Sequence, residues 1–191
     1  MGIFEKLGQL NNGVCPWWLC RSFDNPLRRL FHDPERLLAP YVKPGMTVVD
    51  IGCGMGYFTL GLARLAGPGG KVVAVDLQER MLEALGQRAL RAGLAERIVR
   101  HRGRPDALGV EGPADFALAF WMVHEVPDKA RFFQEIMAFL KPGGRLLVVE
   151  PKYHVTKKSL ERTLAVCREA GFGILERPPV PLSRAVLLAK G

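Results

Sequence analysis

The sequence has little cysteine, no long apolar run and no acidic excess. Its 191 residues include four cysteines, at positions 15, 20, 53 and 167, which does not suit a disulfide-rich secreted scaffold. No stretch reaches the roughly 18 apolar residues of a membrane span, and the first residues lack the basic and apolar regions of a signal peptide. We therefore expect a cytoplasmic protein without a membrane span.

The sequence also lacks the spacing of common metal sites. Cys15 and Cys20 are separated by four residues, which is not a usual arrangement of zinc ligands. Soft thiolates could bind a metalloid, but cysteines of this kind are commonly buried as small apolar side chains. We expect no metal.

Positive charge is concentrated near the end of the chain. The 27 basic and 19 acidic residues give a formal net charge of +8, and residues 141–191 carry 10 basic and 4 acidic residues. Such a distribution is compatible with binding to nucleic acid or to an acidic protein, although many enzymes are basic as well. An RNA or protein substrate therefore stays an alternative at this point.

Apolar strand-like runs alternate with helical patterns from residue 46 onward. The expected strands are 46–51, 71–76, 98–102, 116–120, 145–150, 173–177 and 184–189, and the helices between them include 57–66 and one that Asp128 begins. This alternation is typical of a doubly wound α/β fold with a parallel sheet, which binds ligands at the carboxyl ends of its strands. The last two strands have no helix between them, so we expect a hairpin and an antiparallel final strand.

The residues before this alternation form a separate part of the prediction. Asp33 followed by Pro34 predicts the start of a helix that ends near Val42. We therefore divide the chain into an N-terminal arm or lid, residues 1–32, and a single α/β domain, residues 33–191. The arm contains the adjacent aromatic residues Trp17 and Trp18, which would be costly to expose and are expected to cover the functional edge of the sheet.

The segment Asp50-Ile-Gly-Cys-Gly-Met-Gly56 joins an expected strand to an expected helix. Glycines let the chain turn tightly and approach a ligand closely. Asp76 follows Gly56 by 20 residues at the end of the next strand, where an acid can bind ribose hydroxyls. The glycine spacing differs from the G-x-G-x-x-G of dinucleotide sites. A nicotinamide site, or a turn that binds nothing, is the alternative interpretation.

This acid-x-G-x-G-x-G motif resembles that of the class I S-adenosylmethionine-dependent methyltransferases, and in particular the small-molecule branch that includes quinone and arsenite methyltransferases. The resemblance covers about residues 36–190 and implies a Rossmann-like seven-stranded sheet with an antiparallel last strand. It also implies S-adenosylmethionine as the cofactor, with its methionine part on the Gly52–Gly54 backbone, its ribose on Asp76 and its adenine under Leu77. The residues assigned to the cofactor are Asp50, Gly52, Cys53, Gly54, Gly56, Asp76, Leu77, Arg104 and Phe120.

Arg104 is a departure from this family pattern, because related proteins often carry an acid there that meets the adenine amino group. The adenine contact would then be made by the backbone, by stacking, or by Asp106.

The loop after the fourth strand, Phe120-Trp-Met-Val-His-Glu125, is expected to border cofactor and acceptor. His124 titrates near neutral pH and could act as a general base, or it could only cap the following turn. The acceptor residues assigned are Trp17, Trp18, Trp121, His124 and Lys152.

The same loop lacks the local signatures of nucleic-acid base methylation, namely Asp or Asn before Pro-Pro and an aromatic residue, or a Pro-Cys nucleophile. We therefore expect a small-molecule acceptor and no nucleic acid. An RNA or protein methyltransferase and a non-catalytic cofactor-binding subunit are the alternatives.

Overall fold

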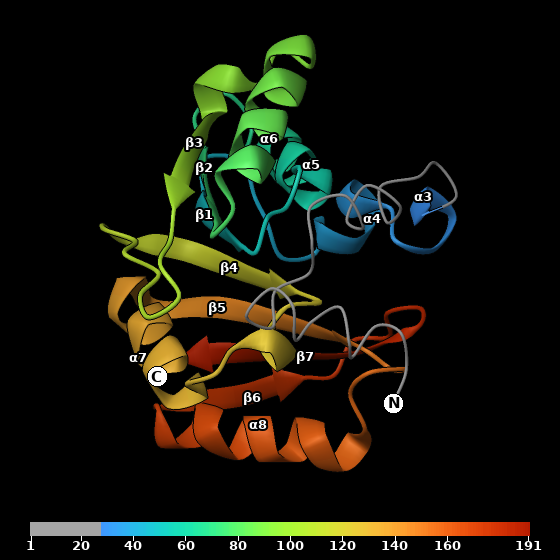
Figure 1. Ribbon diagram of the computed structural model, residues 1–191, viewed down its shortest axis with the longest axis vertical. Coiled ribbons are helices and arrows are strands. Elements are labelled where there is room, and N and C mark those ends of the chain that lie inside the picture. Colours follow the sequence, from blue (N-terminus) through green and yellow to red (C-terminus); the bar gives the residue numbers. More distant parts are fainter. Residues whose placement is uncertain (1–27) are drawn as a thin grey trace.

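A seven-stranded sheet forms the centre of the structure (Figure 1). The computed structural model describes residues 28–191. The strands are β1 Thr47–Ile51, β2 Lys71–Asp76, β3 Ile98–Arg102, β4 Ala114–Phe120, β5 Leu140–Pro151, β6 Phe172–Glu176 and β7 Ser183–Lys190. Their order in the sheet is β3-β2-β1-β4-β5-β7-β6.

One strand of this sheet, β7, runs opposite to the others. Each adjacent pair from β3 to β5 is parallel, whereas β7 runs antiparallel to both β5 and β6. The predicted hairpin and the antiparallel last strand are therefore confirmed. Since β1 to β5 point the same way, their carboxyl ends meet at one edge, and the loops that follow them can form a site there.

Helices cover both faces of the sheet. Those described are α3 Arg28–Phe31, α4 Pro34–Leu38, α5 Tyr57–Ala66, α6 Glu79–Arg91, α7 Lys129–Phe139 and α8 Lys157–Glu169, with short 3₁₀ helices η2 Ala95–Arg97 and η3 Val123–Glu125. Asp33 and Asp128 accept hydrogen bonds from the backbone N–H groups of Arg36 and Arg131, so both predicted caps are present. No helix within residues 28–191 is long and apolar enough to cross a membrane.

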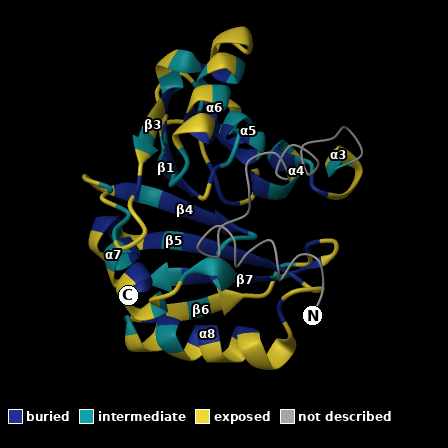
Figure 2. Ribbon diagram, viewed as in Figure 1, coloured by how far each residue is buried: buried dark blue, intermediate teal, exposed yellow. Residues whose placement is uncertain are grey.

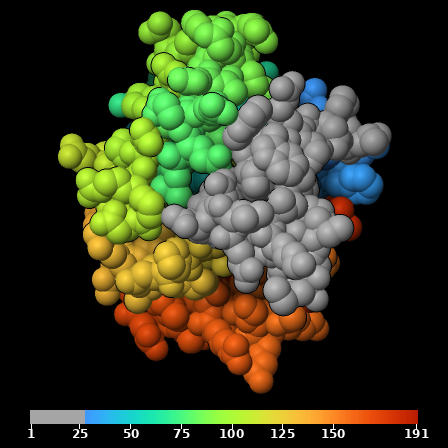
Figure 3. All heavy atoms as spheres, in the orientation of Figure 1, coloured from blue at the N-terminus to red at the C-terminus, as the bar shows by residue number. Residues whose placement is uncertain are grey.

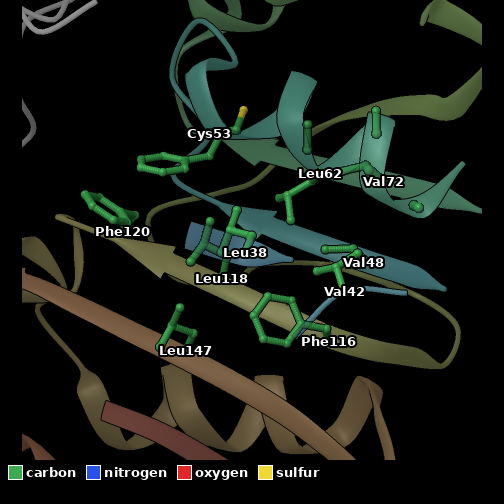
Figure 4. Close-up of a cluster of buried hydrophobic side chains, with 14 of the residues drawn as sticks. Leu38, Val42, Val48, Cys53, Leu62, Val72, Phe116, Leu118, Phe120 and Leu147 are labelled. Carbon is green, nitrogen blue, oxygen red and sulfur yellow. The ribbon is translucent and has the colours of Figure 1, made fainter. Parts of the chain in front are cut away.

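Two apolar clusters lie on opposite faces of the sheet. In the first, α4, α5 and α6 pack on the strands, and Figure 4 shows Leu38, Leu62 and Leu118 of this cluster. In the second, α7 and α8 pack on the other face. Strand side chains alternate between the clusters, as Val48 and Val49 of β1 show. Figure 2 shows the result, with the central strands β4 and β5 largely dark blue and exposed yellow residues on the outer sides of the helices.

The largest differences from the sequence prediction lie at the end of α4 and at the starts of β4 and β5. Helix α4 ends at Leu38, not near Val42, because Pro40 has no N–H group to continue the helical hydrogen bonds. Strand β4 begins at Ala114, which pairs with Leu140, and the pairing then shifts so that Phe116 faces Arg145. The residues between Leu140 and Arg145 thus form a bulge within β5 where the sequence predicted only a turn.

In the space-filling view, later segments in orange and red make the lower part of the molecule, and the green middle of the sequence makes the upper part (Figure 3).

Candidate functional site

The three glycines after β1 all have positive φ, and two of them also lie close to neighbouring side chains. Their φ angles are 71° at Gly52, 53° at Gly54 and 84° at Gly56, a region that residues with a Cβ rarely adopt. A Cβ on Gly56 would lie 2.2 Å from Leu85, whereas a Cβ on Gly54 would meet nothing within 4 Å. Gly56 therefore allows α5 to pack on α6, and the space above Gly54 is open to a ligand.

The amide groups of this loop donate to the protein itself. The N–H groups of Gly52 and Cys53 both donate to the carbonyl oxygen of Val75, at 2.9 and 3.0 Å. The N–H of Gly54 donates to Asp76 Oδ2 at 2.9 Å. These three amides are thus engaged and do not form the anion-binding cradle that a pyrophosphate requires, which disfavours a dinucleotide.

Asp76 joins the glycine loop to the end of β2. Its Oδ2 accepts from Gly54, and its Oδ1 accepts from the N–H of Gln78 at 2.9 Å. Burial raises the pKa of Asp76, and the backbone N–H donors at Gln78, Gly54 and Leu77 oppose that rise. A carboxylate has about four acceptor positions, and these three amides leave Asp76 with acceptor capacity for a hydroxyl group of a ligand.

Asp50 lies beneath the loop and does not line a cavity. Only 2% of it is exposed, and its Oδ2 accepts a hydrogen bond of 2.6 Å from the hydroxyl of Thr59 in α5. Burial raises the pKa of Asp50 to about 7, the Thr59 hydrogen bond opposes that rise, and the charge of Asp76 adds to it. Asp50 therefore fastens the end of β1 to the first turn of α5 and holds the loop between them.

A cavity of about 380 Å³ opens beside the loop, within the range of about 300–1,000 Å³ that small-molecule sites occupy. The structure brings these sequence-assigned residues to its lining: Gly52, Gly54, Asp76, Leu77, Arg104, Phe120 and Trp121. Asp50, Cys53, Gly56, His124 and Lys152 are not among the lining residues. Burial raises the pKa of the Cys53 thiol well above its ordinary value, so this thiol is unreactive in its loop.

Arg104 lies at the rim of the cavity. Its side chain is 74% exposed and its Nε lies 3.5 Å from Asp106 Oδ1. Arg104 and Ala107 exchange two backbone hydrogen bonds of 2.8 and 3.1 Å, which close a tight turn. The turn is therefore fixed by its backbone, and the arginine side chain extends from it into solvent.

Trp121 has an unusual backbone at the end of β4. Its φ is 60°, a strained value for a bulky residue. Two hydrogen bonds fix it: its N–H donates to the Val149 carbonyl at 2.7 Å, and its indole Nε1 donates to Ser183 Oγ at 2.9 Å. The indole ring is thereby turned to the cavity wall.

An aromatic group adjoins this wall. Its members are Tyr57, Phe58, Phe120 and Trp121, and the guanidinium of Arg28 lies 4.5 to 5.7 Å from the four ring centres. His32 meets the rings of Phe120 and Trp121 edge-on, and its Nε2 lies 2.7 Å from the Pro181 carbonyl. The sequence analysis missed Arg28, His32 and Ser183, because neither period nor motif links them to the glycine loop.

His124 lies in η3, beside the cavity but outside its lining. Its Nδ1 is 2.6 Å from Glu150 Oε2, and its backbone N–H donates to Glu150 Oε1 at 3.1 Å. The position of Glu150 at the end of β5 was the signal that could have identified this partner from the sequence.

Lys152 and the residues of the N-terminal arm complete the assigned set. Lys152 is exposed, and its backbone N–H donates to the Leu182 carbonyl. Trp17, Trp18, Cys15 and Cys20 lie outside the described residues, as does most of the predicted arm. Within residues 28–191 no group of three His, Cys, Asp or Glu side chains is arranged to hold a metal ion.

Comparison with known proteins identifies the family. A family model described as a methyltransferase domain matches residues 42–172. The chain belongs to this methyltransferase family. The family and fold are those predicted from the glycine motif, that is, of class I S-adenosylmethionine-dependent methyltransferases.

Individual relatives agree with this assignment. Demethylmenaquinone methyltransferase from Lactococcus lactis is 32% identical over 121 residues, which are 61% of this chain and 48% of the relative. Ribosomal protein L11 methyltransferase from Pelotomaculum thermopropionicum is 36% identical over 136 residues, 69% of this chain and 42% of the relative. The chain thus spans about half the length of the curated relatives it matches.

A solved structure shows the same fold over nearly all of the methyltransferase chain. A SAM-dependent methyltransferase from Aquifex aeolicus has a TM-score of 0.83 at 24% identity, covering 93% of this chain and 100% of that one.

Proposed function

We propose that the protein transfers a methyl group from S-adenosylmethionine to a small apolar acceptor of the quinol type. The observation that carries the proposal is the cavity beside the glycine loop, in which Asp76 faces the open space above Gly54. The methyltransferase family and its demethylmenaquinone-methylating relative support the reaction and the acceptor class. The two buried free thiols, Cys53 and Cys167, suit the reducing cytoplasm that we propose as its location.

The lining residues fit the donor. Asp76 would accept from a ribose hydroxyl, and Leu77 would cover the adenine, with Arg104 at the rim. Gly52 and Gly54 line the cavity, and their backbone would hold the methionine part of the donor. Bound S-adenosylmethionine supplies a methyl group already activated by the positive charge on its sulfur.

Asp50, Cys53 and Gly56 would support the donor from beneath. Asp50 holds the loop through Thr59, and Gly56 allows the close approach of Leu85. Phe120, whose ring lies 4.1 Å from that of Phe58, would separate the donor side of the cavity from the acceptor side.

The acceptor side is aromatic. Trp121 and its neighbouring rings offer a flat apolar wall, which favours a planar acceptor ring over a flexible polar one. We propose that Trp17 and Trp18 complete this wall from the N-terminal arm, that Lys152 meets polar groups of the acceptor at its exposed end, and that His124 removes a proton from the acceptor.

Two measurements test the proposal. Calorimetry should show micromolar binding of S-adenosylmethionine and of its demethylated product, and no comparable binding of NADH. With 2-methyl-1,4-naphthoquinol as the acceptor probe, mass spectrometry should then show a methylated product that needs both substrates. NADH binding in place of the donor would overturn the proposal. Donor binding with methylation of RNA or ribosomal protein alone would overturn the acceptor class, and donor binding without any turnover would indicate a non-catalytic subunit.

A further inference from the structure

The strongest unassigned feature is the contact between Glu150 and His124. Strands β4 and β5 are parallel and pair Phe120 with Val149, so the residues that follow each strand meet at the same edge. Glu150 is 2% exposed, and it directs both carboxylate oxygens at one residue. Oε1 accepts from the backbone N–H of His124 at 3.1 Å, and Oε2 lies 2.6 Å from its Nδ1.

This pairing fixes the state of the imidazole ring. An ionised carboxylate accepts hydrogen bonds and cannot donate them, so Nδ1 carries the proton and Nε2 carries the lone pair in the neutral ring. The second hydrogen bond, to the backbone of the same residue, fixes the carboxylate relative to η3. Nε2 lies on the side of the ring away from Glu150.

A row of rings connects His124 with the cavity wall. Trp121 and Tyr153 are 5.8 Å apart between ring centres, Tyr153 and His154 are 4.7 Å apart, and His154 stacks on His124 at 5.5 Å and 17°. The row begins at a cavity-lining residue and ends at the imidazole. A planar acceptor that packs on Trp121 and along these rings would direct a hydroxyl group toward His124.

We propose that Glu150 is a positioning residue that makes His124 the general base for the acceptor. This inference rests on the proposed function and adds a residue and a tautomer to it. In the transfer, the O–H bond of the acceptor breaks and the proton passes to Nε2. The electron pair of that bond moves into the acceptor. A pair of electrons on the acceptor then forms the new bond to the methyl carbon. The electrons of the carbon–sulfur bond remain on sulfur. The positive charge lost at sulfur thus appears on the imidazolium, which Glu150 stabilises.

Charged groups from each packed element face this ring. Burial lowers the pKa of His124, but the hydrogen bond and charge of Glu150 and the charge of Glu125 raise it more, against the opposing charge of Lys129, so that the net shift is upward. His154, from the loop after β5, adds a second titrating ring beside it. Without the Glu150 charge, burial is the largest remaining influence on the pKa of His124 and exceeds the upward effect of Glu125, so the shift should turn downward.

NMR of the whole chain tests the positioning without any acceptor. In wild type, the ¹⁵N shifts of His124 should report a protonated Nδ1 and an unprotonated Nε2, with a pKa above about 6.5. In Glu150→Gln, which keeps the side-chain shape, the pKa of His124 should fall below that of wild type. Glu161→Gln removes a surface carboxylate of α8 that pairs with Arg177, and it should leave His124 unchanged. Signals are assigned with His124→Gln and His154→Gln.

Turnover tests the chemical role. With 2-methyl-1,4-naphthoquinol, Glu150→Gln should lower kcat about 10-fold or more, leave donor affinity unchanged, and move the rising limb of the pH profile to lower pH. With an acceptor that is already ionised at the assay pH, the loss should shrink to less than about 3-fold, because no proton has to be removed. A merely structural role would affect both acceptors equally.

The outcomes separate the two proposals. A wild type that binds the donor but methylates no small molecule overturns the proposed function, whereas the NMR result still decides the tautomer and its dependence on Glu150. Turnover in wild type with an unchanged pH profile in Glu150→Gln overturns the inference and leaves the function standing. If Glu150→Gln does not fold, Glu150→Asp serves in its place, because it retains the charge at a shorter reach. An Nε2–H tautomer of His124 in wild type would also overturn the inference.

Discussion

Asp50 and Glu150 are the same kind of group in two different regions of one sheet edge. Both are carboxylates near the carboxyl ends of strands, and both are 2% exposed. Asp50 accepts from a neutral hydroxyl, that of Thr59, and burial raises its pKa to about 7. Glu150 contacts a histidine that can carry a positive charge. The partner, more than burial, therefore decides whether a buried carboxylate is suited to holding a loop or to supporting proton transfer.

The same division applies to the two halves of the sheet. On the side of β1 and β2, the polar contacts of Asp50 and Asp76 stay within the loop and its helix, which suits the binding of a donor. On the side of β4 and β5, strained Trp121 and the paired His124 adjoin an aromatic wall, which suits a reacting acceptor. Variants on the first side should change donor affinity or stability, and variants on the second side should change turnover.

Asp50→Asn should give the largest energetic effect, a change in the free energy of unfolding. The unfolded carboxyl ionises near pH 4, whereas the native one ionises at about 7. The native state therefore binds the extra proton between these values, and wild-type stability falls as pH rises through this window. Asparagine keeps an acceptor for Thr59 without the charge. Urea unfolding should show the variant gaining on wild type from pH 4 to pH 8, by up to about 4 kcal/mol. A pH-independent difference would contradict the raised pKa.

His124→Ala should lower turnover about 100-fold, or about 2.7 kcal/mol, while donor affinity stays nearly unchanged. Donor affinity should persist because the ring lies outside the cavity lining, and turnover should fall because the ring is the proposed general base. Steady-state kinetics with the quinol probe and calorimetry with the donor make the check. Full activity would assign His124 a structural role and leave alignment of the acceptor as the source of rate.

Asp76→Ala and Gly54→Val should each weaken donor binding at least 10-fold, or about 1.4 kcal/mol. Alanine removes the acceptor for the ribose and for the Gly54 amide. Valine fills the open space above Gly54 and strains a backbone with φ of 53°. Calorimetry measures both, with circular dichroism to confirm folding. Unchanged affinity in folded variants would place the donor elsewhere.

Arg104→Ala should have the smallest effect, less than about 3-fold on donor affinity, because an exposed side chain in a surface ion pair contributes little. The turn that Arg104 forms with Ala107 is fixed by backbone hydrogen bonds and should persist. A loss of 10-fold or more in calorimetry would show that the guanidinium contacts the adenine directly.

Much of the fold followed from local sequence patterns. Helix α5 and strands β2 and β3 have the predicted boundaries, since apolar runs, glycine turns and caps lie next to each other in the chain. The predicted end of α4 was wrong, although Pro40, which ends this helix, is also a local feature of the sequence. The bulge within β5 was missed because it depends on the pairing of Ala114 with Leu140, two residues far apart in sequence.

The candidate site divides in the same way. The sequence by itself determined the glycine loop, Asp76 and the family, because a strand, a tight turn and a helix N-terminus are encoded within about 30 consecutive residues. Only the tertiary structure decided that Asp50 bonds to Thr59, that Arg28 and His32 reach the rings of Phe120 and Trp121, and that Glu150 meets His124. These contacts arise where different strands end at one sheet edge, and neither spacing nor periodicity specifies which side chains meet there.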